Sequence, residues 1–248
     1  MPTLSEIKKA LRRYANPKQA RLLQGFFKTD PGEYGEGDVF LGLKVPQTRT
    51  VARQYRDLPL PMIERLLSAR GGSAFGGKSP IHEERLLALL ILVDQFQRAD
   101  EPRRAVICRF YLRHTRYINN WDLVDLSASR ILGVFLLDKD KQLLFKLARS
   151  RMLWERRIAV IATAEFIRHS IFGPTLRISA GLLGDKEDLI HKAVGWMLRE
   201  VGKKDQPTLE RFLKKHGPAM PRTMLRYAIE RFPEPKRQWY LNRWAGGA

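Results

Sequence analysis

The chain has 248 residues, of which 44% are hydrophobic, enough for a folded core and too many for a disordered protein. Its 45 Lys and Arg outnumber its 26 Asp and Glu, and the resulting net charge of +19 favours a polyanionic partner, either nucleic acid or an anionic membrane surface. The single cysteine, Cys108, excludes an internal disulfide bond and most thiol-based zinc sites, and it indicates a reducing, intracellular compartment. No signal peptide is expected, and the longest apolar stretch, residues 86–93, is too short to span a bilayer.

Apolar residues recur at helical spacing along nearly the whole chain, and no segment has the alternating pattern of a β-strand. The predicted fold class is therefore all-α. Segment 30–41 (DPGEYGEGDVFL) is rich in glycine and acidic residues, so it is predicted to be an ordered loop that leads to a new helix at Pro46. From Pro80 onward, prolines and glycines delimit four helix pairs, at 80–117, 119–149, 151–183 and 186–215.

Pairs of about 35 to 45 residues match the period of HEAT or armadillo repeats. We expect an α-solenoid of HEAT-like antiparallel helix pairs, a curved slab with a basic concave face, in a single domain over residues 1–248. A basic curved slab suits duplex nucleic acid, and such a fold works as a monomer.

A glycine-rich segment, residues 72–79 (GSAFGGKS), matches the Walker A pattern of nucleotide-binding proteins. A phosphate-binding loop of that kind follows a buried strand, whereas the preceding residues (PMIERLLSAR) have helical spacing. The acidic segment 89–94 (LLILVD) lies inside the next predicted helix, so it supplies no magnesium-binding strand. Residues 71–80 are interpreted as a connection with a basic tip rather than a nucleotide site.

The residues that most often ligate metals or act as nucleophiles form no motif. The five histidines are too far apart in sequence to make a paired ligand motif, and no nucleophile elbow is present. Cys108 lies among apolar residues of a predicted helix and is interpreted as an inert buried thiol. We therefore expect neither a metal nor another cofactor.

A carboxylate interrupts an apolar stripe of the helix that begins near Asn120. At 100° per residue, one stripe holds Trp121, Asp125, Ala128, Leu132 and Phe135. An unpaired charge buried there costs several kcal/mol, on the order of the penalty for any buried ion. Asp125 must therefore be paired, act as a cap or line a cleft, and a structural and a functional role both stay open. A simple first-turn acid, favoured by the helix dipole, describes Asp122 better.

Two further residues have unusual positions on their helices. Arg157 shares an apolar row with Leu153 and Val160, where it can tie a neighbouring helix end or bind a phosphate. Trp196 lies off the core stripe of helix 187–203, on the flank that carries Lys192, Arg199 and Lys203. A tryptophan on a basic face is typical of nucleic-acid contact. The other basic residues near helix ends predict binding to phosphates that weakens with salt.

Three segments taken together, NNWDLVD (119–125), WERRIAV (154–160) and LIHKAVGWMLREVGK (189–203), resemble the bacterial AlkD-type DNA alkylation repair glycosylases. The resemblance covers most of the chain and extends to DVFLGLKVPQTR (38–49), HEERLLALLIL (82–92) and MPRTMLRYAIERF (220–232). It implies a HEAT-like solenoid that hydrolyses the N-glycosidic bond of N3- or N7-alkylated purines in duplex DNA, without metal or cofactor. It further implies a cytoplasmic, nucleoid-associated monomer.

The resemblance also assigns roles to particular residues. The catalytic aspartate of the family falls on Asp125, the two tryptophans that hold the damaged nucleotide fall on Trp121 and Trp196, and the arginine of the site falls on Arg157. These are the positions that the helical spacing singles out independently. DNA-binding roles are expected for Phe26, Lys28, Lys192, Arg199 and Lys203.

The sequence departs from the better-known branch of the family near its N-terminus. Phe26 replaces a tyrosine, so a hydroxyl contact to DNA is lost, and the loops 29–37 and 70–80 are longer. These loops bear on how DNA enters the site. The alternative function is a non-catalytic HEAT-repeat protein that binds DNA as a scaffold, which needs no carboxylate at position 125.

Overall fold

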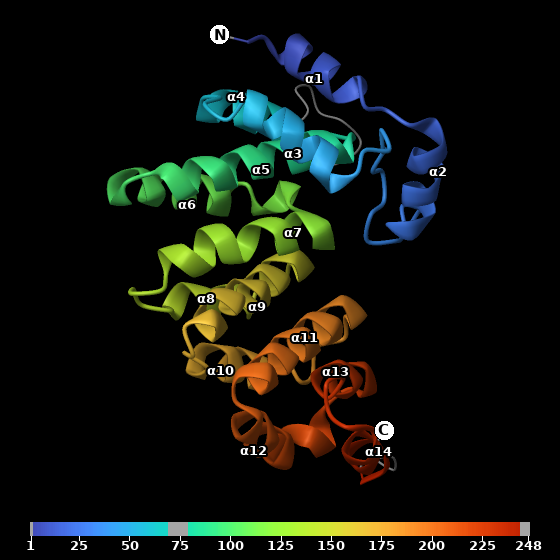
Figure 1. Cartoon of the computed structure of the whole chain (residues 1–248), viewed down its shortest axis with the longest axis vertical. Coiled ribbons are helices and arrows are strands. Elements are labelled where there is room, and N and C mark those ends of the chain that lie inside the picture. Colours follow the sequence, from blue (N-terminus) through green and yellow to red (C-terminus); the bar gives the residue numbers. More distant parts are fainter. Residues whose placement is uncertain (1, 69–78, 244–248) are drawn as a thin grey trace. The chain divides into compact units, whose positions relative to one another are not determined.

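The computed structural model describes residues 2–68 and 79–243, and its regular structure is helical (Figure 1). Within these ranges there is no β-strand, and Val39 and Ile81 form an isolated bridge. The all-α fold class is therefore confirmed. By its internal contacts the chain divides into two compact units, Met1–Ser127 and Ala128–Ala248. The single domain and the basic concave face stay predictions.

Unit 1 contains seven α-helices in its described residues, the last of which ends at the boundary between the units. They are α1 (Leu4–Arg12), α2 (Pro17–Phe26), α3 (Val45–Gln54), α4 (Leu60–Leu67), α5 (His82–Arg98), α6 (Glu101–Arg113) and α7 (Trp121–Ala128). Several begin at side chains that satisfy the free N–H groups of a first turn. Asn16 accepts a hydrogen bond from the Gln19 N–H ahead of Pro17, and Asp100 does the same for α6.

The core of unit 1 is built on α5, which packs against α3 and α4. Every residue from 86 to 93 is buried, and so is Phe96. By contrast, α2 buries none of its residues and lies at the edge of the unit (Figure 1). Leu22 and Phe26 on this helix are 62% and 64% exposed.

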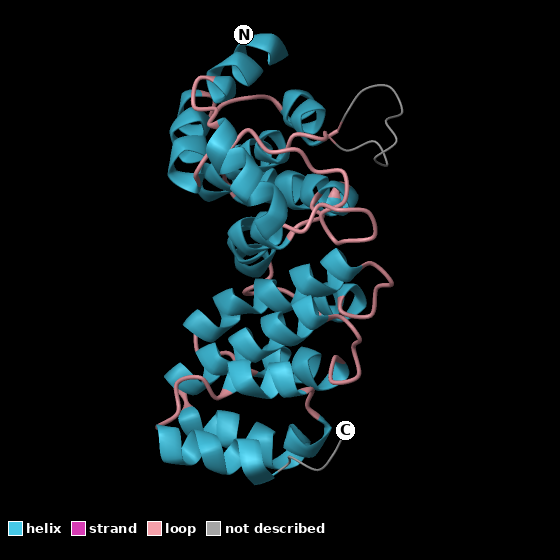
Figure 2. Ribbon diagram, turned by 90° about the vertical axis from the view of Figure 1, so that its right-hand side faces the viewer, coloured by secondary structure: helices cyan, strands magenta, loops and turns pink. Residues whose placement is uncertain are grey.

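Unit 2 begins with a π-helical turn, η2 (Ser129–Gly133), that continues directly from α7. Its α-helices in the described residues are joined by short loops (Figure 2). They are α8 (Gln142–Leu147), α9 (Leu153–Arg168), α10 (Gly173–Gly181), α11 (Asp188–Lys204), α12 (Gln206–His216), α13 (Arg222–Ala228) and α14 (Glu234–Arg243). The core of this unit lies between α9, α11 and α13, where α11 packs on both of the others.

The predicted helix pairs coincide with α5 and α6, α7 and α8, α9 and α10, and α11 and α12. Segment 30–41 is a loop, as predicted, and α3 starts one residue before Pro46. Cys108 is buried in α6, which agrees with its interpretation as a core thiol.

The Walker-like segment lies outside the described residues except for Ser79. Its flanks are helical as predicted: α4 precedes it, and residues 89–94 lie inside α5. Among the described helices, none combines the length and the apolar character that crossing a membrane requires.

Candidate active site

The residues expected to carry chemistry in unit 1 project from α7. Asn120 immediately precedes this helix, and its side-chain oxygen accepts a hydrogen bond from the Trp121 N–H at 2.8 Å. Trp121 and Asp125 follow one helical turn apart, and both are half-buried. Burial is the largest effect on the pKa of Tyr111 and raises it. The hydrogen bond with Ser127 lowers this pKa, whereas electrostatic interactions with Cys108 and Asp125 raise it further. The Asp125 carboxylate is therefore within electrostatic reach of a buried neutral phenol.

Trp121 forms one end of a stack of rings. Its indole lies parallel to Phe27, with ring centroids 5.0 Å apart and an angle of 16° between the planes. Phe27 stacks in turn on Phe40 at 5.0 Å, and Phe40 stacks on His82 at 4.6 Å. The exposed Phe26 meets Trp121 edge-on at 5.9 Å. The expected DNA-binding residue Phe26 and the expected site residue Trp121 are thus in contact within unit 1.

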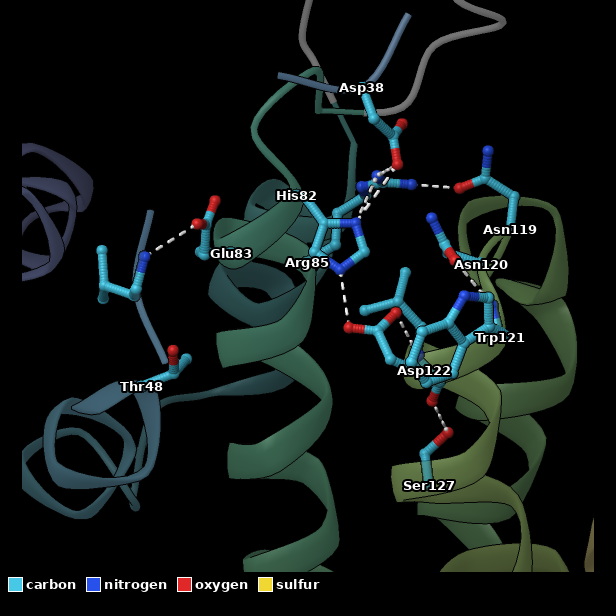
Figure 3. A network of polar contacts seen from close by, with 12 residues as sticks. Asp38, Thr48, His82, Glu83, Arg85, Asn119, Asn120, Trp121, Asp122 and Ser127 are labelled. Atoms are coloured by element: carbon cyan, nitrogen blue, oxygen red, sulfur yellow. Dashed lines mark hydrogen bonds and ion pairs between the residues drawn. The ribbon is translucent and has the colours of Figure 1, made fainter. Parts of the chain in front are cut away.

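The other end of the stack is a buried network of charges (Figure 3). His82 lies between two carboxylates, with Nδ1 3.2 Å from Asp38 and Nε2 2.8 Å from Asp122. Arg85 donates to the same Asp38 oxygen at 2.5 Å and also to the side chain of Asn119. His82, Asp38 and Arg85 are each at most 2% exposed. The network therefore joins the loop before α3, the first turn of α5 and the first turn of α7.

The charge state of His82 follows from its two partners. Burial lowers the pKa of His82, but the charge of Asp122 and the hydrogen bonds to Asp122 and Asp38 outweigh it and raise the pKa to about 9. Arg85 opposes this rise. At neutral pH the ring is an imidazolium, and each of its N–H groups donates a hydrogen bond to a carboxylate.

The first turn of α5 carries four consecutive charged residues, His82, Glu83, Glu84 and Arg85, which we call the HEER quartet; all four are buried. Glu83 accepts backbone hydrogen bonds from residues 41, 42 and 43. Glu84 binds Ser79 and Lys8. Sequence reasoning missed this cluster, although one signal was present: four successive helical positions cover 300° of the helix, so they cannot all face solvent.

In unit 2, Arg157 is buried and donates to the backbone oxygen of Leu189, in the first turn of α11, at 2.6 Å. This is the structural tie to a neighbouring helix end that the sequence allowed. Its neighbour Arg156 forms a second tie, with a hydrogen bond of 2.7 Å from Nε to Asp185. A phosphate contact by Arg157 stays a prediction.

Trp196 is half-buried on α11 and lines a surface cavity of about 440 Å³ with residues of α9 and α11, among them the cations Arg168, Lys203 and Lys204. The predicted core stripe of α11, Ile190, Ala193, Val194, Met197 and Val201, is buried. The tryptophan thus lies off the core on a basic flank, as expected.

The three cations predicted to bind DNA near Trp196 all have acidic neighbours. Lys192 pairs with Asp188 at 2.7 Å, Lys203 pairs with Glu200 at 2.7 Å, and Arg199 binds Glu230 and Glu200. Ion pairs near the surface contribute little to stability, so a phosphate can displace the acidic partner at small cost. Lys28, the remaining expected cation, is exposed just after α2 with a positive φ of 49°.

The site residues therefore form two groups. Unit 1 brings Phe26, Trp121 and Asp125 together around the start of α7, and unit 2 places Arg157 and Trp196 on the adjacent helices α9 and α11.

The described chain is thus an all-helical protein of successive helix pairs with a strongly basic composition. A family model described as DNA alkylation repair enzyme matches residues 7–232, so the chain belongs to this family.

A solved structure described as a predicted DNA alkylation repair enzyme from Enterococcus faecalis has a similar fold. Its TM-score is 0.66 at 15% sequence identity, and the match covers 89% of this chain and 97% of that one. The likeness shows that the two chains share a fold. A search of curated proteins finds no match.

Proposed function

We propose that the protein is a DNA glycosylase that removes N3- or N7-alkylated purines from duplex DNA. The observation that carries the proposal is the half-buried carboxylate of Asp125, which lies one helical turn after Trp121. The rings of Phe26 and Phe27 contact the Trp121 indole. Membership of a DNA alkylation repair family and the net charge of +19 support a DNA substrate.

Hydrolysis of the glycosidic bond of an alkylated purine requires mainly electrostatic stabilisation from the protein. Alkylation at N3 or N7 makes the purine cationic, so the bond between C1′ and the base nitrogen breaks as its electron pair neutralises the leaving base. The sugar becomes an oxocarbenium-like cation, which a nearby carboxylate stabilises. Water then adds to C1′ and loses a proton to solvent, leaving an abasic site. Asp125 would stabilise the cation and orient that water, while Trp121, one helical turn away, shields the sugar.

A base-release assay tests this role of Asp125. On methylated duplex DNA we expect the wild-type protein to release 7-methylguanine and Asp125→Asn to release it at least about 100-fold more slowly. Asn has nearly the same shape, so the fold should be retained, and DNA affinity should be equal or slightly higher because a negative charge is lost. Asp138→Asn, the same change at an exposed carboxylate, is the matched control and should behave like wild type.

The rival function is a scaffold that binds DNA without chemistry. It is favoured if the wild-type protein binds the methylated duplex but releases no base. Base release by Asp125→Asn at the wild-type rate would leave the activity in place and refute the role of this carboxylate.

A further inference from the structure

We propose that His82 is a positioning residue for the candidate active site, because its two hydrogen bonds fix the first turn of α7 and with it the orientation of the Trp121 indole. The consequence for catalysis rests on the proposed function. The consequence for the geometry of Trp121 does not.

The geometry ties His82 to Trp121 by two routes. The first runs through the backbone, because the Nε2 of His82 donates a hydrogen bond to Asp122, and Asp122 directly follows Trp121 in the chain. The second passes through rings, because Phe27 contacts the imidazole at 5.2 Å and stacks on the indole at 5.0 Å. The first route restricts the backbone of Trp121, and the second restricts its ring.

The opposite side of His82 is anchored as well. Its Nδ1 faces Asp38, which Arg85 also binds, and both of these residues are almost fully buried. Water hardly reaches this region to replace a lost bond, so displacement of the imidazole deprives two buried carboxylates of a charged partner. A bond to an anchored group transmits position, whereas a bond to a mobile surface group does not.

Both bonds require the doubly protonated ring, since a neutral imidazole has only one N–H to donate. The charged groups that face it are Asp38 from the loop, Asp122 from α7 and Arg85 from its own helix. With a pKa of about 9, the bridge is complete at neutral pH and loses one donor as the pH rises through that value. Because the folded pKa exceeds the usual value of 6.5, this contribution to stability is fully present below pH 6.5 and is lost as the pH approaches and passes 9.

The first experiment observes Trp121 directly and needs no activity. Protein labelled with 5-fluorotryptophan gives one ¹⁹F resonance for each tryptophan, and the signal of Trp121 is identified by its absence in Trp121→Phe. We expect the Trp121 resonance of the wild-type protein to shift between pH 7 and 10.5 with a midpoint near 9. In His82→Gln the resonance should be displaced at neutral pH and should not titrate.

Glu84→Gln is the matched control. Glu84 is as deeply buried as His82 in the same helical turn, but it binds Ser79 and Lys8 of α1 instead of α7. This variant should lose stability while its Trp121 resonance titrates like that of wild type. If Glu84→Gln displaces the resonance as much as His82→Gln does, the effect is general destabilisation and the proposal is wrong.

A second variant covers the case in which His82→Gln does not fold. Asp38→Asn removes one of the groups that raise the His82 pKa and leaves the bond to Asp122, so the Trp121 midpoint should move below that of wild type. A wild-type resonance that does not titrate, or an unchanged midpoint in Asp38→Asn, overturns the proposal.

The second experiment measures base release from methylated DNA at pH 7.5. A positioning role predicts that His82→Gln lowers kcat roughly tenfold, while KM and DNA affinity change less than about threefold. Wild-type release with an unchanged kcat in His82→Gln contradicts the role in catalysis. No release by wild type counts against the proposed function alone, because the ¹⁹F titration still decides whether His82 positions Trp121.

Discussion

Glu83→Ala should lower the free energy of unfolding by about 4 kcal/mol, the largest effect that we expect from a single substitution in unit 1. The carboxylate accepts hydrogen bonds from the N–H groups of Leu41, Gly42 and Leu43 at 2.8 to 3.1 Å. Alanine leaves these donors without an acceptor in a region that water hardly reaches. Each buried unsatisfied N–H costs about 1 to 3 kcal/mol.

The loss should extend beyond the loop itself. The oxygen of Leu41 accepts a hydrogen bond from the Asn16 N–H, and Gly42 has a φ of +89° and passes so close to Asn16 that a Cβ would lie 2.2 Å from its oxygen. The anchored loop therefore supports the start of α2, which ends at Phe26. We expect Glu83→Ala to loosen α2 as well, with increased hydrogen exchange in residues 17–26.

Urea unfolding measures the effect, and two further variants interpret it. Glu83→Gln keeps one acceptor oxygen and should fall between alanine and wild type. Glu64→Ala removes an exposed glutamate that pairs with His114, and should cost at most about 1 kcal/mol. Equal losses in Glu83→Ala and Glu64→Ala would show that the backbone bonds of Glu83 add nothing.

Gly195→Leu should destabilise unit 2 by at least about 3 kcal/mol, because α13 packs against α11 at this residue too closely for a side chain. A Cβ at position 195 would lie 2.5 Å from the backbone oxygen of Met224 and 2.5 Å from the Cβ of Tyr227. Neither atom can move without moving α13, so the helices must separate. Gly195→Ala should show a smaller loss, since the better helix propensity of alanine offsets part of the strain.

Gly181→Leu is the control for this substitution. Gly181 ends α10 at an exposed position, and a Cβ there meets nothing within 4 Å. The change should leave thermal stability within about 1 kcal/mol of wild type or raise it slightly. A Gly195→Leu variant as stable as Gly181→Leu would mean that α11 and α13 tolerate a wider separation than their packing indicates.

The fold was predictable because each helix pair can be recognised from residues close together in the sequence. Apolar residues at helical spacing mark the buried faces, and Pro102, Pro174 and Pro207 lie in the first turns of helices that the structure contains. These signals act over a few residues, so one sequence is enough to read them. The division into two compact units depends on contacts between distant segments and left no comparable local signal.

The stripe predicted from Trp121 to Phe135 holds as far as Leu132. Ala128 and Leu132 are buried as expected, whereas Phe135 is only half-buried, with Lys139 over its ring. The reason is η2, whose π-helical turn contains i to i+5 hydrogen bonds and alters the angle between successive side chains. A spacing of 100° per residue therefore no longer places Phe135 correctly, beyond this turn.

The buried charges were the main omission. Periodicity treats His82 and Asp122 as surface residues, and their mutual contact spans 40 positions in the sequence. Asp122 lies in the first turn of α7, as predicted, but its hydrogen bond with His82 was not predicted. For Arg157 the sequence left two roles open, and the bond to Leu189 accounts for one of them.

Cys108 has a practical consequence for kinetics. It is the only thiol of the chain and is 1% exposed inside unit 1, so a thiol reagent reacts with it only when that unit opens. The rate of modification at saturating reagent therefore reports the opening rate of unit 1, and the rate at low reagent reports its opening equilibrium. Since unit 2 contains no cysteine, the thiol follows one half of the chain alone, without any engineered label.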